Sequence, residues 1–476
     1  MATFTPPLKK SSVSVRAAVN PGVDQLRRKL SPKAVALTPD SPGYDRRRLL
    51  LNRRFDYRPA VIVSCVTDQD VAVTVRFARD QQMRIAVRAG GCSPAGFSSN
   101  DGGVQLDLSG FNRISVDPKA MTAQIGAGVL LQQVVETLGP ANLMVPVGEC
   151  MPVGMSGFAL GGGFGLLSRS VGLGCDNIVE ATMVTAHGLV VTASARENPE
   201  LWWALRGAGG GNFGVVTSLT MRLHPIPPQL PFASVIWPEA QATEVLNTLL
   251  PYFAAEAPDQ FNAIFSMLPM QQVGRAIGTM AAYHGSPEQA KACLARLTSV
   301  GKPLSAKTGA MPYAQMLTAI PNQAADIHDY YKSGFVTGVL PEAAVATVVQ
   351  GFRSAPERVP TMMNMVAFEL AGGAINRVAP TDTAFVHRRH TLLLSIVATW
   401  AGPAGAPNPP EKRWADGVYA AMLPYLSGEV YQNYPDLELS NPVLAYYGEN
   451  LARLRSIKRT FDPDNVFQFP QGILPA

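Results

Sequence analysis

The sequence predicts an α+β fold with more than one domain, and three observations carry that prediction. The chain has 476 residues, of which 47% are hydrophobic and 16% charged, so it can bury sizeable cores and exceeds the usual size of one domain. Its first half alternates short apolar strands with amphipathic helices and glycine-rich turns. From residue 232 to residue 429, longer apolar strands alternate with helices, which is typical of an α+β layer domain.

The first half of the chain begins with a strand, a helix and a second strand. Thr67 and Asp68 form a capping pair in front of an amphipathic segment that ends near residue 81. The strand after it runs into a glycine turn, Ala89-Gly90-Gly91-Cys92-Ser93-Pro94, whose backbone N–H groups could hold phosphate oxygens. Strands are expected over 60–64, 84–88, 103–108, 113–116, 122–125, 177–185, 190–193 and 215–223. Helices are expected over 23–30, 68–81, 129–138 and 199–205.

The stretch from Val147 to Gly165 is unusually rich in glycine. Cys150 is followed there by Gly154, Gly157, Gly161, Gly162, Gly163 and Gly165. Three consecutive glycines are costly inside a plain strand or helix, so they predict either a closely bound ligand or a tight bend between core strands. A third glycine-rich loop covers 206–214, and three such loops suggest a long ligand such as a dinucleotide. Neither G-x-G-x-x-G followed by a helix nor G-x-x-x-x-G-K-[ST] occurs, which argues against a nicotinamide enzyme and a nucleoside triphosphatase.

Four prolines between residues 225 and 231 predict a domain boundary. Strands are expected beyond it over 233–237, 263–267, 276–283, 363–369 and 392–399. Helices are expected over 241–253, 287–297, 341–352, 411–426 and 445–460. This part has no glycine loops, so we expect it to cover the substrate.

Composition excludes several other classes. The net charge of +5 is spread along the chain without a basic stripe, so no nucleic-acid partner is expected. No apolar run is long enough for a membrane span and no signal-peptide core follows the first residue, so we expect a cytoplasmic protein with no membrane partner. Five cysteines without a C-x-x-C pair indicate neither a disulfide framework nor a metal site.

Six motifs, in this order, together resemble the berberine-bridge-enzyme-like branch of the vanillyl-alcohol-oxidase flavoprotein family. They are Arg88-Ala89-Gly90-Gly91-Cys92-Ser93, the Cys150 loop, Gly161-Gly162-Gly163-Phe164-Gly165, W-A-L-R-G-A-G-G-G-N-F-G over 203–214, Tyr431-Gln432-Asn433-Tyr434-Pro435-Asp436, and Tyr447-Gly448-Glu449-Asn450 with Phe461-Asp462-Pro463-Asp464-Asn465-Val466-Phe467. The resemblance covers about residues 45–472.

The resemblance implies a PCMH-type FAD-binding domain of two α/β subdomains, completed by the C-terminal tail, together with an α+β substrate domain with an antiparallel sheet backed by helices. It divides the chain into an arm (1–45), the FAD-binding domain (46–228), the substrate-binding domain (229–429) and the completing segment (430–476). The FAD pyrophosphate would lie in the 88–93 turn and the isoalloxazine near 150–165, with 206–216 along the cofactor. The implied cofactor-binding residues are Arg88, Ala89, Gly90, Gly91, Cys92, Ser93, Cys150, Gly154, Gly157, Gly161, Gly162, Gly163, Gly165, Phe213, Gly214, Val216, Tyr447 and Asn450.

Two cysteines bear on how FAD is attached. The family cysteine that matches Cys150 often bonds to flavin C6, which implies a covalent link here, whereas a buried apolar thiol is the plainer alternative. Family members usually have histidine where this chain has Cys92, so an 8α-histidyl link is excluded. Cys92 could be an unbonded small residue, a thioether to the flavin 8α-carbon, or an inactivating replacement.

The resemblance implies hydride transfer to flavin N5 from a C–H bond next to oxygen or nitrogen of a small molecule. A secondary metabolite is the expected substrate, with O2 as electron acceptor and H2O2 as product. Tyr434 is the best candidate for proton acceptor, although a tyrosine stacked in the core is the alternative. Because a free tyrosine has a pKa of about 10, it would need a cation or a hydrogen bond to its oxygen.

Further candidates would line the substrate pocket. The candidates for the pocket wall are Glu369, Ser395 and Tyr331, followed by Tyr330 and Tyr446. For Glu369, a salt bridge at the end of its strand is the alternative. Plant relatives carry a base on the strand over 392–400, where this chain has Ser395 and Leu393, so no glutamate base is expected. Oxidative cyclisation or C–C bond formation, carbohydrate oxidation and a non-redox flavoprotein cyclase stay open as alternative functions.

Overall fold

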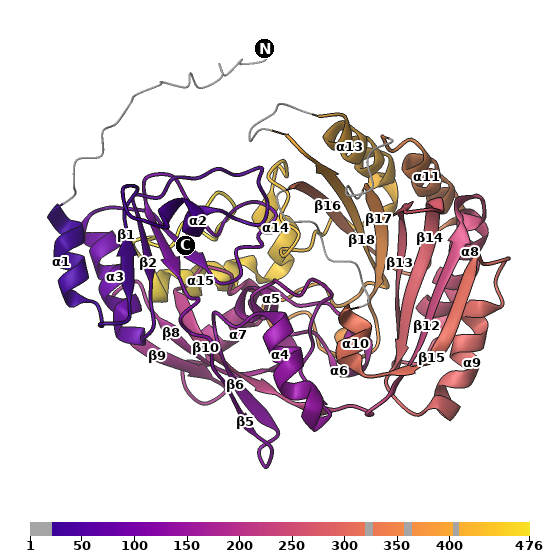
Figure 1. The fold of residues 1–476 in the computed structure, drawn as a ribbon, viewed down its shortest axis with the longest axis horizontal. Helices are drawn as coiled ribbons and strands as arrows, with labels where there is room; N and C mark the ends of the chain where they lie inside the picture. The colour runs from indigo at the N-terminus through magenta and orange to yellow at the C-terminus, as the bar shows by residue number, and fades with distance from the viewer. Residues whose placement is uncertain (1–20, 319–326, 357–363, 403–408) are drawn as a thin grey trace.

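The computed structural model describes residues 21–318, 327–356, 364–402 and 409–476, and Figure 1 shows them as two sheet-containing halves side by side. The N-terminal half contains a four-stranded sheet and a five-stranded sheet. The other half contains one seven-stranded sheet. No helix in the described part of the chain is both long and apolar enough to cross a bilayer.

The four-stranded sheet is ordered β1-β2-β4-β3, and its last three strands run parallel. The strands are β1 (Val35–Leu37), β2 (Val61–Ser64), β4 (Val104–Asp107) and β3 (Ile85–Arg88). Helices α1 (Pro21–Lys29), α2 (Tyr44–Arg48) and α3 (Asp68–Asp80) accompany it. Helix α3 begins with the expected cap, because the Asp70 N–H donates to Thr67 Oγ1 at 3.1 Å and the Thr67 N–H donates back to Asp70 Oδ2 at 3.0 Å.

The five-stranded sheet is antiparallel and ordered β5-β6-β10-β8-β9. Its strands are β5 (Ile114–Asp117), β6 (Thr122–Gly126), β10 (Val215–Arg222), β8 (Ile178–Val184) and β9 (Val190–Ser194). The helices around it are α4 (Leu131–Leu138), α5 (Met155–Leu160), α6 (Ser168–Val171) and α7 (Pro199–Ala208), and a small ribbon pairs β7 (Leu143–Met144) with β11 (His224–Pro225). The strands and helices expected before residue 223 are confirmed, with ends shifted by a few residues, while α5 inside the glycine stretch was not foreseen.

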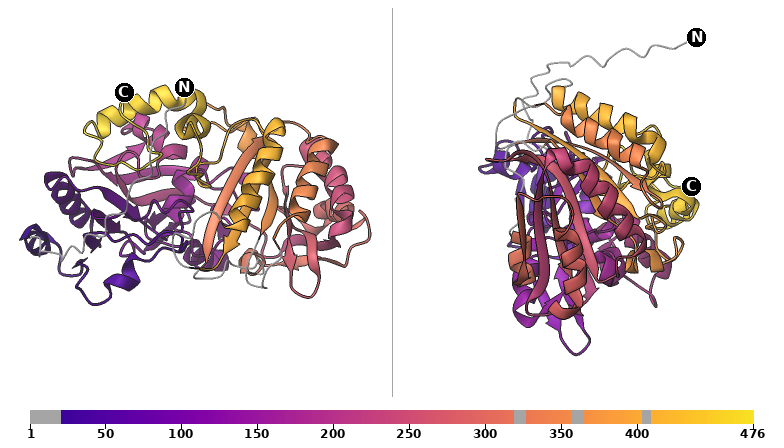
Figure 2. Two further views of the ribbon diagram at one scale, coloured as in Figure 1. Left: turned by 90° about the horizontal axis from the view of Figure 1, so that it is seen from above. Right: turned by 90° about the vertical axis from the view of Figure 1, so that its right-hand side faces the viewer.

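The seven-stranded sheet is antiparallel and ordered β15-β12-β14-β13-β17-β18-β16. Its strands are β15 (Ser305–Met311), β12 (Leu230–Pro238), β14 (Gly274–Tyr283), β13 (Phe261–Met270), β17 (Met365–Leu370), β18 (Leu392–Trp400) and β16 (His328–Val336). Helices α8 (Ala242–Ala255), α9 (Pro287–Thr298), α11 (Glu342–Arg353) and α13 (Pro410–Met422) cover one face (Figure 2). Residue 363, where one expected strand was to begin, lies outside the described residues, and β15 and β16 were missed.

The other face of this sheet is turned toward the N-terminal half. Because side chains alternate along a strand, Phe368 and Leu394 lie in the apolar cluster under the helices, whereas Leu393 and Phe335 pack with Phe164 and Tyr431 of the opposite half. The position of each functional candidate along its strand therefore decides which face of the sheet its side chain lies on.

The C-terminal segment returns to the N-terminal half, where Figure 1 shows it in yellow among the purple elements. It contains α14 (Pro442–Tyr447) and α15 (Leu451–Phe461), and α15 packs on α7. The single helix expected over 445–460 was wrong, because Gly448 takes φ 46° and ψ −127° and breaks it. The domain boundaries at residues 45, 228 and 429 stay predictions.

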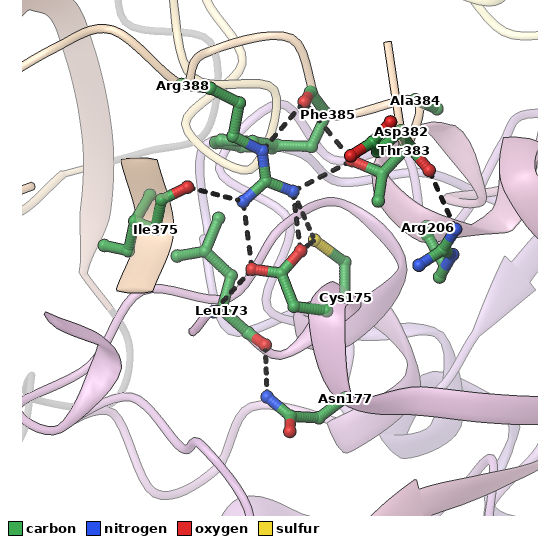
Figure 3. Close-up of polar contacts among 12 residues, drawn as sticks. Leu173, Cys175, Asn177, Arg206, Ile375, Asp382, Thr383, Ala384, Phe385 and Arg388 are labelled. Carbon is green, nitrogen blue, oxygen red and sulfur yellow. Dashed lines mark hydrogen bonds and ion pairs between the residues drawn. The ribbon is translucent and has the colours of Figure 1, made fainter. Parts of the chain in front are cut away.

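A buried ion pair joins the loop before β18 to the N-terminal half (Figure 3). The Arg388 guanidinium donates to both carboxylate oxygens of Asp176, at 2.6 and 2.9 Å, and also to Thr383 Oγ1. This fork-to-fork geometry fixes the loop that carries Phe385. A Cβ on Gly207, at φ 127°, would lie 2.3 Å from the Phe385 nitrogen, so the glycine permits the close approach of the two segments.

Candidate active site

The turn after β3 has the features of an anion site. Among the described residues, no acceptor is found for the backbone N–H groups of Gly90, Gly91, Cys92 and Ser93. Gly91 takes φ 74°, a conformation in which successive N–H groups point to one side. Arg88 adds a guanidinium at the same place. Since four orphaned donors and a cation suit a pyrophosphate, the turn fits the phosphates of FAD.

A cavity of about 320 Å³ lies at this turn. Its lining includes Arg46, Arg47 and Arg88 together with Asp107, Gly128 and Gln133. The Arg88 side chain donates to the Arg47 carbonyl, and Arg47 pairs with Asp107 at 2.9 Å. Three arginines against one carboxylate make the lining of the cavity cationic, which suits the phosphates of a dinucleotide.

The glycine-rich stretches serve two different purposes. A Cβ added to Gly157 or to Gly210 would meet no atom within 4 Å, so both glycines border open space. The run of three glycines instead packs against protein. A Cβ on Gly161 would lie 2.0 Å from Asn433 Oδ1, and one on Gly162 2.8 Å from the Tyr431 ring. The C-terminal segment therefore occupies the Cβ side of Gly161 and Gly162, and contact of this run with a cofactor stays a prediction.

The turn at 88–93 and the Cys150 loop touch each other. A Cβ on Gly90 would lie 2.5 Å from the Gly154 nitrogen, and Cys92 Sγ donates to the Pro152 carbonyl at 3.4 Å. Burial raises the pKa of the Cys150 thiol to about 11, with the Asp329 carboxylate contributing. Burial raises the pKa of the Cys92 thiol to about 12, and Cys150 is the next largest cause. The two free, half-buried thiols therefore share one site.

The remaining cofactor candidates lie in supporting positions. Phe213 and Val216 are buried in the core of the five-stranded sheet, and a Cβ on Gly214 would lie 2.5 Å from the Val184 carbonyl. Tyr447 accepts from Asn212 at 3.5 Å. Asn450 donates to the Pro380 and Thr383 carbonyls, at 2.8 and 3.1 Å. Gly163 and Gly165 also pack closely on protein, against Phe158 and the Val147 carbonyl.

Tyr434 lies over the inner face of the seven-stranded sheet. Its hydroxyl donates to Glu369 Oε1 of β17 at 2.9 Å, and its ring lies 5.5 Å from that of Tyr331 on β16. Burial, followed by the Glu369 charge, raises the pKa of Tyr434 well above its usual value. Burial also raises the pKa of Glu369 to about 7, while the hydrogen bond from Tyr434 lowers it. Glu369 of β17 is thus the hydrogen-bond partner of Tyr434. It makes this bond in place of the strand-end salt bridge considered for it above.

Strand register places the other pocket candidates. Ser395 of β18 is buried beside Ser333 and Ala367, two residues from Leu393, which pairs with Glu369. Tyr330 points to the opposite face, where its hydroxyl donates to Asp416 and Glu438. Tyr330 is therefore removed from the pocket wall.

Glu149, next to Cys150, escaped the sequence analysis. Its Oε1 is buried and has no hydrogen-bond partner. Burial, followed by the Glu369 charge, raises the pKa of Glu149 to about 8. The same charge acts on Tyr434, so Glu149, Glu369 and Tyr434 form one electrostatic group. An acid within an otherwise apolar, glycine-rich motif was the signal that could have identified it.

Asp329 of β16 is a third buried acid here and, after Glu149, the second that the sequence analysis missed. It lies on the strand face that also carries Tyr331, and the residue is only 3% exposed. Its Oδ1 has no hydrogen-bond partner, and burial raises its pKa to about 7. Asp329 acts electrostatically on both Cys92 and Cys150.

Comparisons with known proteins agree with this geometry. Residues 59–194 match the family model described as FAD binding domain, and residues 430–474 match Berberine and berberine like. An FAD-linked oxidoreductase of Bacillus subtilis (strain 168) is 33% identical over 92% of this chain and 96% of its own. The (R)-6-hydroxynicotine oxidase of Paenarthrobacter nicotinovorans is 30% identical over 94% of this chain and 98% of its own.

Solved structures give the same result. BBE-like 1 of Physcomitrella patens has a TM-score of 0.86 at 29% identity and covers 95% of this chain and 99% of its own. The 6-hydroxy-D-nicotine oxidase of Arthrobacter nicotinovorans has a TM-score of 0.84 at 28% identity, over 94% of this chain and 99% of its own. With the phosphate-type turn, the thiol loop and the returning C-terminal segment all in place, the chain belongs to the berberine-bridge-enzyme-like family of FAD-linked oxidases.

Proposed function

We propose that this FAD-linked oxidase removes a hydride from a C–H bond next to oxygen or nitrogen of a small molecule, with O2 as the final electron acceptor. FAD, when bound, supplies the two-electron acceptor at its isoalloxazine ring. The observation that carries the proposal is the Tyr434–Glu369 pair at 2.9 Å beside the half-buried Cys150 loop.

Tyr434 and Glu369 would handle the proton that leaves the substrate heteroatom. Glu369 accepts the Tyr434 hydrogen bond, so a proton passing to the tyrosine oxygen can continue to the carboxylate. With a pKa raised to about 7, Glu369 is a far better base at neutral pH than the tyrosine itself. Tyr331 would support the ring of Tyr434, and Ser395 would form part of the pocket floor.

Residues near the turn would hold the cofactor. The orphaned N–H groups at Gly90–Ser93, with Arg88, would bind the pyrophosphate, and Gly157 and Gly210 would border the flavin-containing space. Cys150 would form the single covalent link, since Cys92 makes a hydrogen bond to Pro152. Acid denaturation should leave yellow colour on the wild-type chain and release it from Cys150→Ala.

Anaerobic reduction tests the proposed reaction. Candidate substrates are added to the holoenzyme without O2, and bleaching of the flavin absorbance is followed in a stopped-flow instrument. Tyr434→Phe should slow bleaching by about 10²-fold, the usual contribution of a proton-transfer group, while FAD content stays near that of wild type. Tyr330→Phe is the matched control, because Tyr330 is adjacent to Tyr331 but faces the helices, and it should bleach at the normal rate.

Two outcomes would contradict the proposal. If no alcohol, amine or sugar bleaches the flavin and no H2O2 forms in air, the non-redox alternative is favoured. If Tyr434→Phe loses FAD and activity together, the residue is structural.

A further inference from the structure

We propose that His387, His390 and Glu429 form a binding site for a divalent transition-metal ion of the zinc class. The inference goes beyond the proposed oxidase function and does not depend on it. The cysteine spacing of the sequence indicates no metal site, and this site uses two imidazoles and a carboxylate instead of thiols.

The arrangement of the three donor groups is the first observation. One ligand atom from each residue lies within 4.8 Å of the other two. Glu429 Oε2 is 2.5 Å from His387 Nδ1 and 3.0 Å from His390 Nε2, so both rings turn a nitrogen to the same carboxylate oxygen. In a tetrahedral zinc site, bonds of about 2.0–2.2 Å place the ligand atoms roughly 3.3 Å apart. The ion would take the place of the two hydrogen bonds, and the closest pair of atoms would separate by less than about 1 Å.

The surroundings hold the three side chains in place without an ion, which is the second observation. His390 Nδ1 lies 2.9 Å from Thr337 Oγ1, so its N–H can donate to that hydroxyl while Nε2 binds the ion. The ring of Phe335 stacks on those of His387 and His390, with centroids 4.4 and 4.9 Å apart. The Phe335 N–H donates to the Glu429 carbonyl at 3.2 Å, which fixes the backbone of the third ligand. Because the ligands are already ordered, binding costs little conformational entropy.

Access and charge also suit a cation. His387 and His390 are only 1% and 3% exposed, whereas the side chain of Glu429 is 36% exposed. An ion can therefore enter from the solvent beside the carboxylate, and water can complete its coordination. Arg388, which lies between the two histidines in sequence, forms its ion pair with Asp176, so its positive charge is compensated.

The site joins two segments that are far apart in sequence. The histidines precede β18, and Glu429 precedes the segment that carries Tyr431 and Tyr434. Phe335 lies 6.4 Å from Tyr431, which in turn lies 5.0 Å from Tyr434, so two aromatic rings link the site to the proposed catalytic tyrosine. We therefore expect the ion to be structural: it would stabilise the return of the C-terminal segment and take no part in the reaction.

The test measures the metal content of the holoenzyme after any affinity tag has been removed. The protein is treated with EDTA, mixed with a small excess of Zn²⁺, desalted and analysed by inductively coupled plasma mass spectrometry. We expect about one zinc per chain in wild type, and less than about a fifth of that in His390→Gln and in Glu429→Gln. His284→Gln is the matched control, because His284 also makes two hydrogen bonds but lies outside this cluster, and it should keep the full zinc content.

Thermal unfolding gives a second measurement. A hundredfold excess of Zn²⁺ over its dissociation constant should raise the unfolding midpoint of wild type by about 3 °C and leave that of Glu429→Gln unchanged. Less than about a tenth of a zinc per chain in wild type would overturn the inference. Equal zinc content in wild type and both variants would also overturn it, since the zinc would then be an adventitious ion only.

If both variants fail to fold, wild type alone decides. Co²⁺ added to the EDTA-treated protein should give the visible bands of a four-coordinate ion at wavelengths longer than those of the flavin, and the spectrum of the six-coordinate aqueous ion would overturn the inference. None of these measurements needs a substrate, so their outcome is independent of the oxidase proposal.

Discussion

Removing the carboxylate of Asp462 should detach the C-terminal helix from the glycine-rich loop that precedes β10. Lys458 is fully buried and donates to Asp462 Oδ2 and to the Asn212 carbonyl, both at 2.6 Å, and to the Phe467 carbonyl at 2.7 Å. Asp462 also accepts from the backbone N–H groups of Val466 and Phe467, at 2.7 and 2.9 Å. One ion pair therefore ties α15, the chain end and the loop at Asn212 together.

The expected cost of Asp462→Ala is about 4 kcal/mol of unfolding free energy. Breaking a buried ion pair by removing one partner costs roughly 3–5 kcal/mol, because the other charge is left uncompensated. The two orphaned N–H groups add to this cost by roughly 1 kcal/mol each or more. Burial already lowers the pKa of Lys458, so deprotonation of the lysine offsets part of the sum.

Urea unfolding of the holoenzyme, followed by tryptophan fluorescence, measures the change, and flavin absorbance of the dialysed protein measures cofactor retention. Asp462→Ala should lower the unfolding midpoint and release FAD more readily. The double variant Lys458→Met/Asp462→Leu should recover at least about 1 kcal/mol, since paired apolar replacement of a buried ion pair is often tolerated. The reasoning would be refuted if Asp462→Ala lost less than about 1 kcal/mol of unfolding free energy, or if the double variant were less stable than the single one.

Three further predictions concern the cofactor loops. Gly165→Ala would place a Cβ 1.9 Å from the Val147 carbonyl and should destabilise the protein by about 3 kcal/mol in thermal unfolding, whereas Gly157→Ala meets nothing within 4 Å and should fold normally but bind less FAD. Folding raises the pKa of Glu149 from 4.5 to about 8, so the folded state holds more protons between these pH values and stability falls as pH rises through them. Glu149→Gln should flatten this dependence of stability on pH. At pH 9 the variant should be more stable than wild type by about 2 kcal/mol, a value discounted because Glu149 is half-buried. An unchanged dependence would contradict the raised pKa of Glu149. Cys92→Ser should keep the flavin colour on the denatured chain, because Cys92 Sγ makes only hydrogen bonds to protein carbonyls, and loss of colour would mean that Cys92 is the attachment point.

The sequence by itself determined the family and most secondary structure. Its motifs are local, so the turn at Gly90 and Gly91 and the loop at Cys150 could be read without knowing what lies opposite them. Capping at Thr67 and alternating strands such as β8 follow equally from neighbouring residues. Strand β16 escaped because its charged residues, Asp329 and Lys332, mask the apolar pattern.

Only the tertiary structure decided which side chains meet. Glu369 lies 65 residues from Tyr434 in sequence, and their contact depends on the register of β17 against β18 and on the return of the C-terminal segment. The three-glycine run permits close approach of any group, and the sequence does not say that Tyr431 and Asn433 pack against its Cβ side. Glu149 acquires its meaning in the same way: a carboxyl group becomes functional through what it is buried against, and burial is a property of the folded chain.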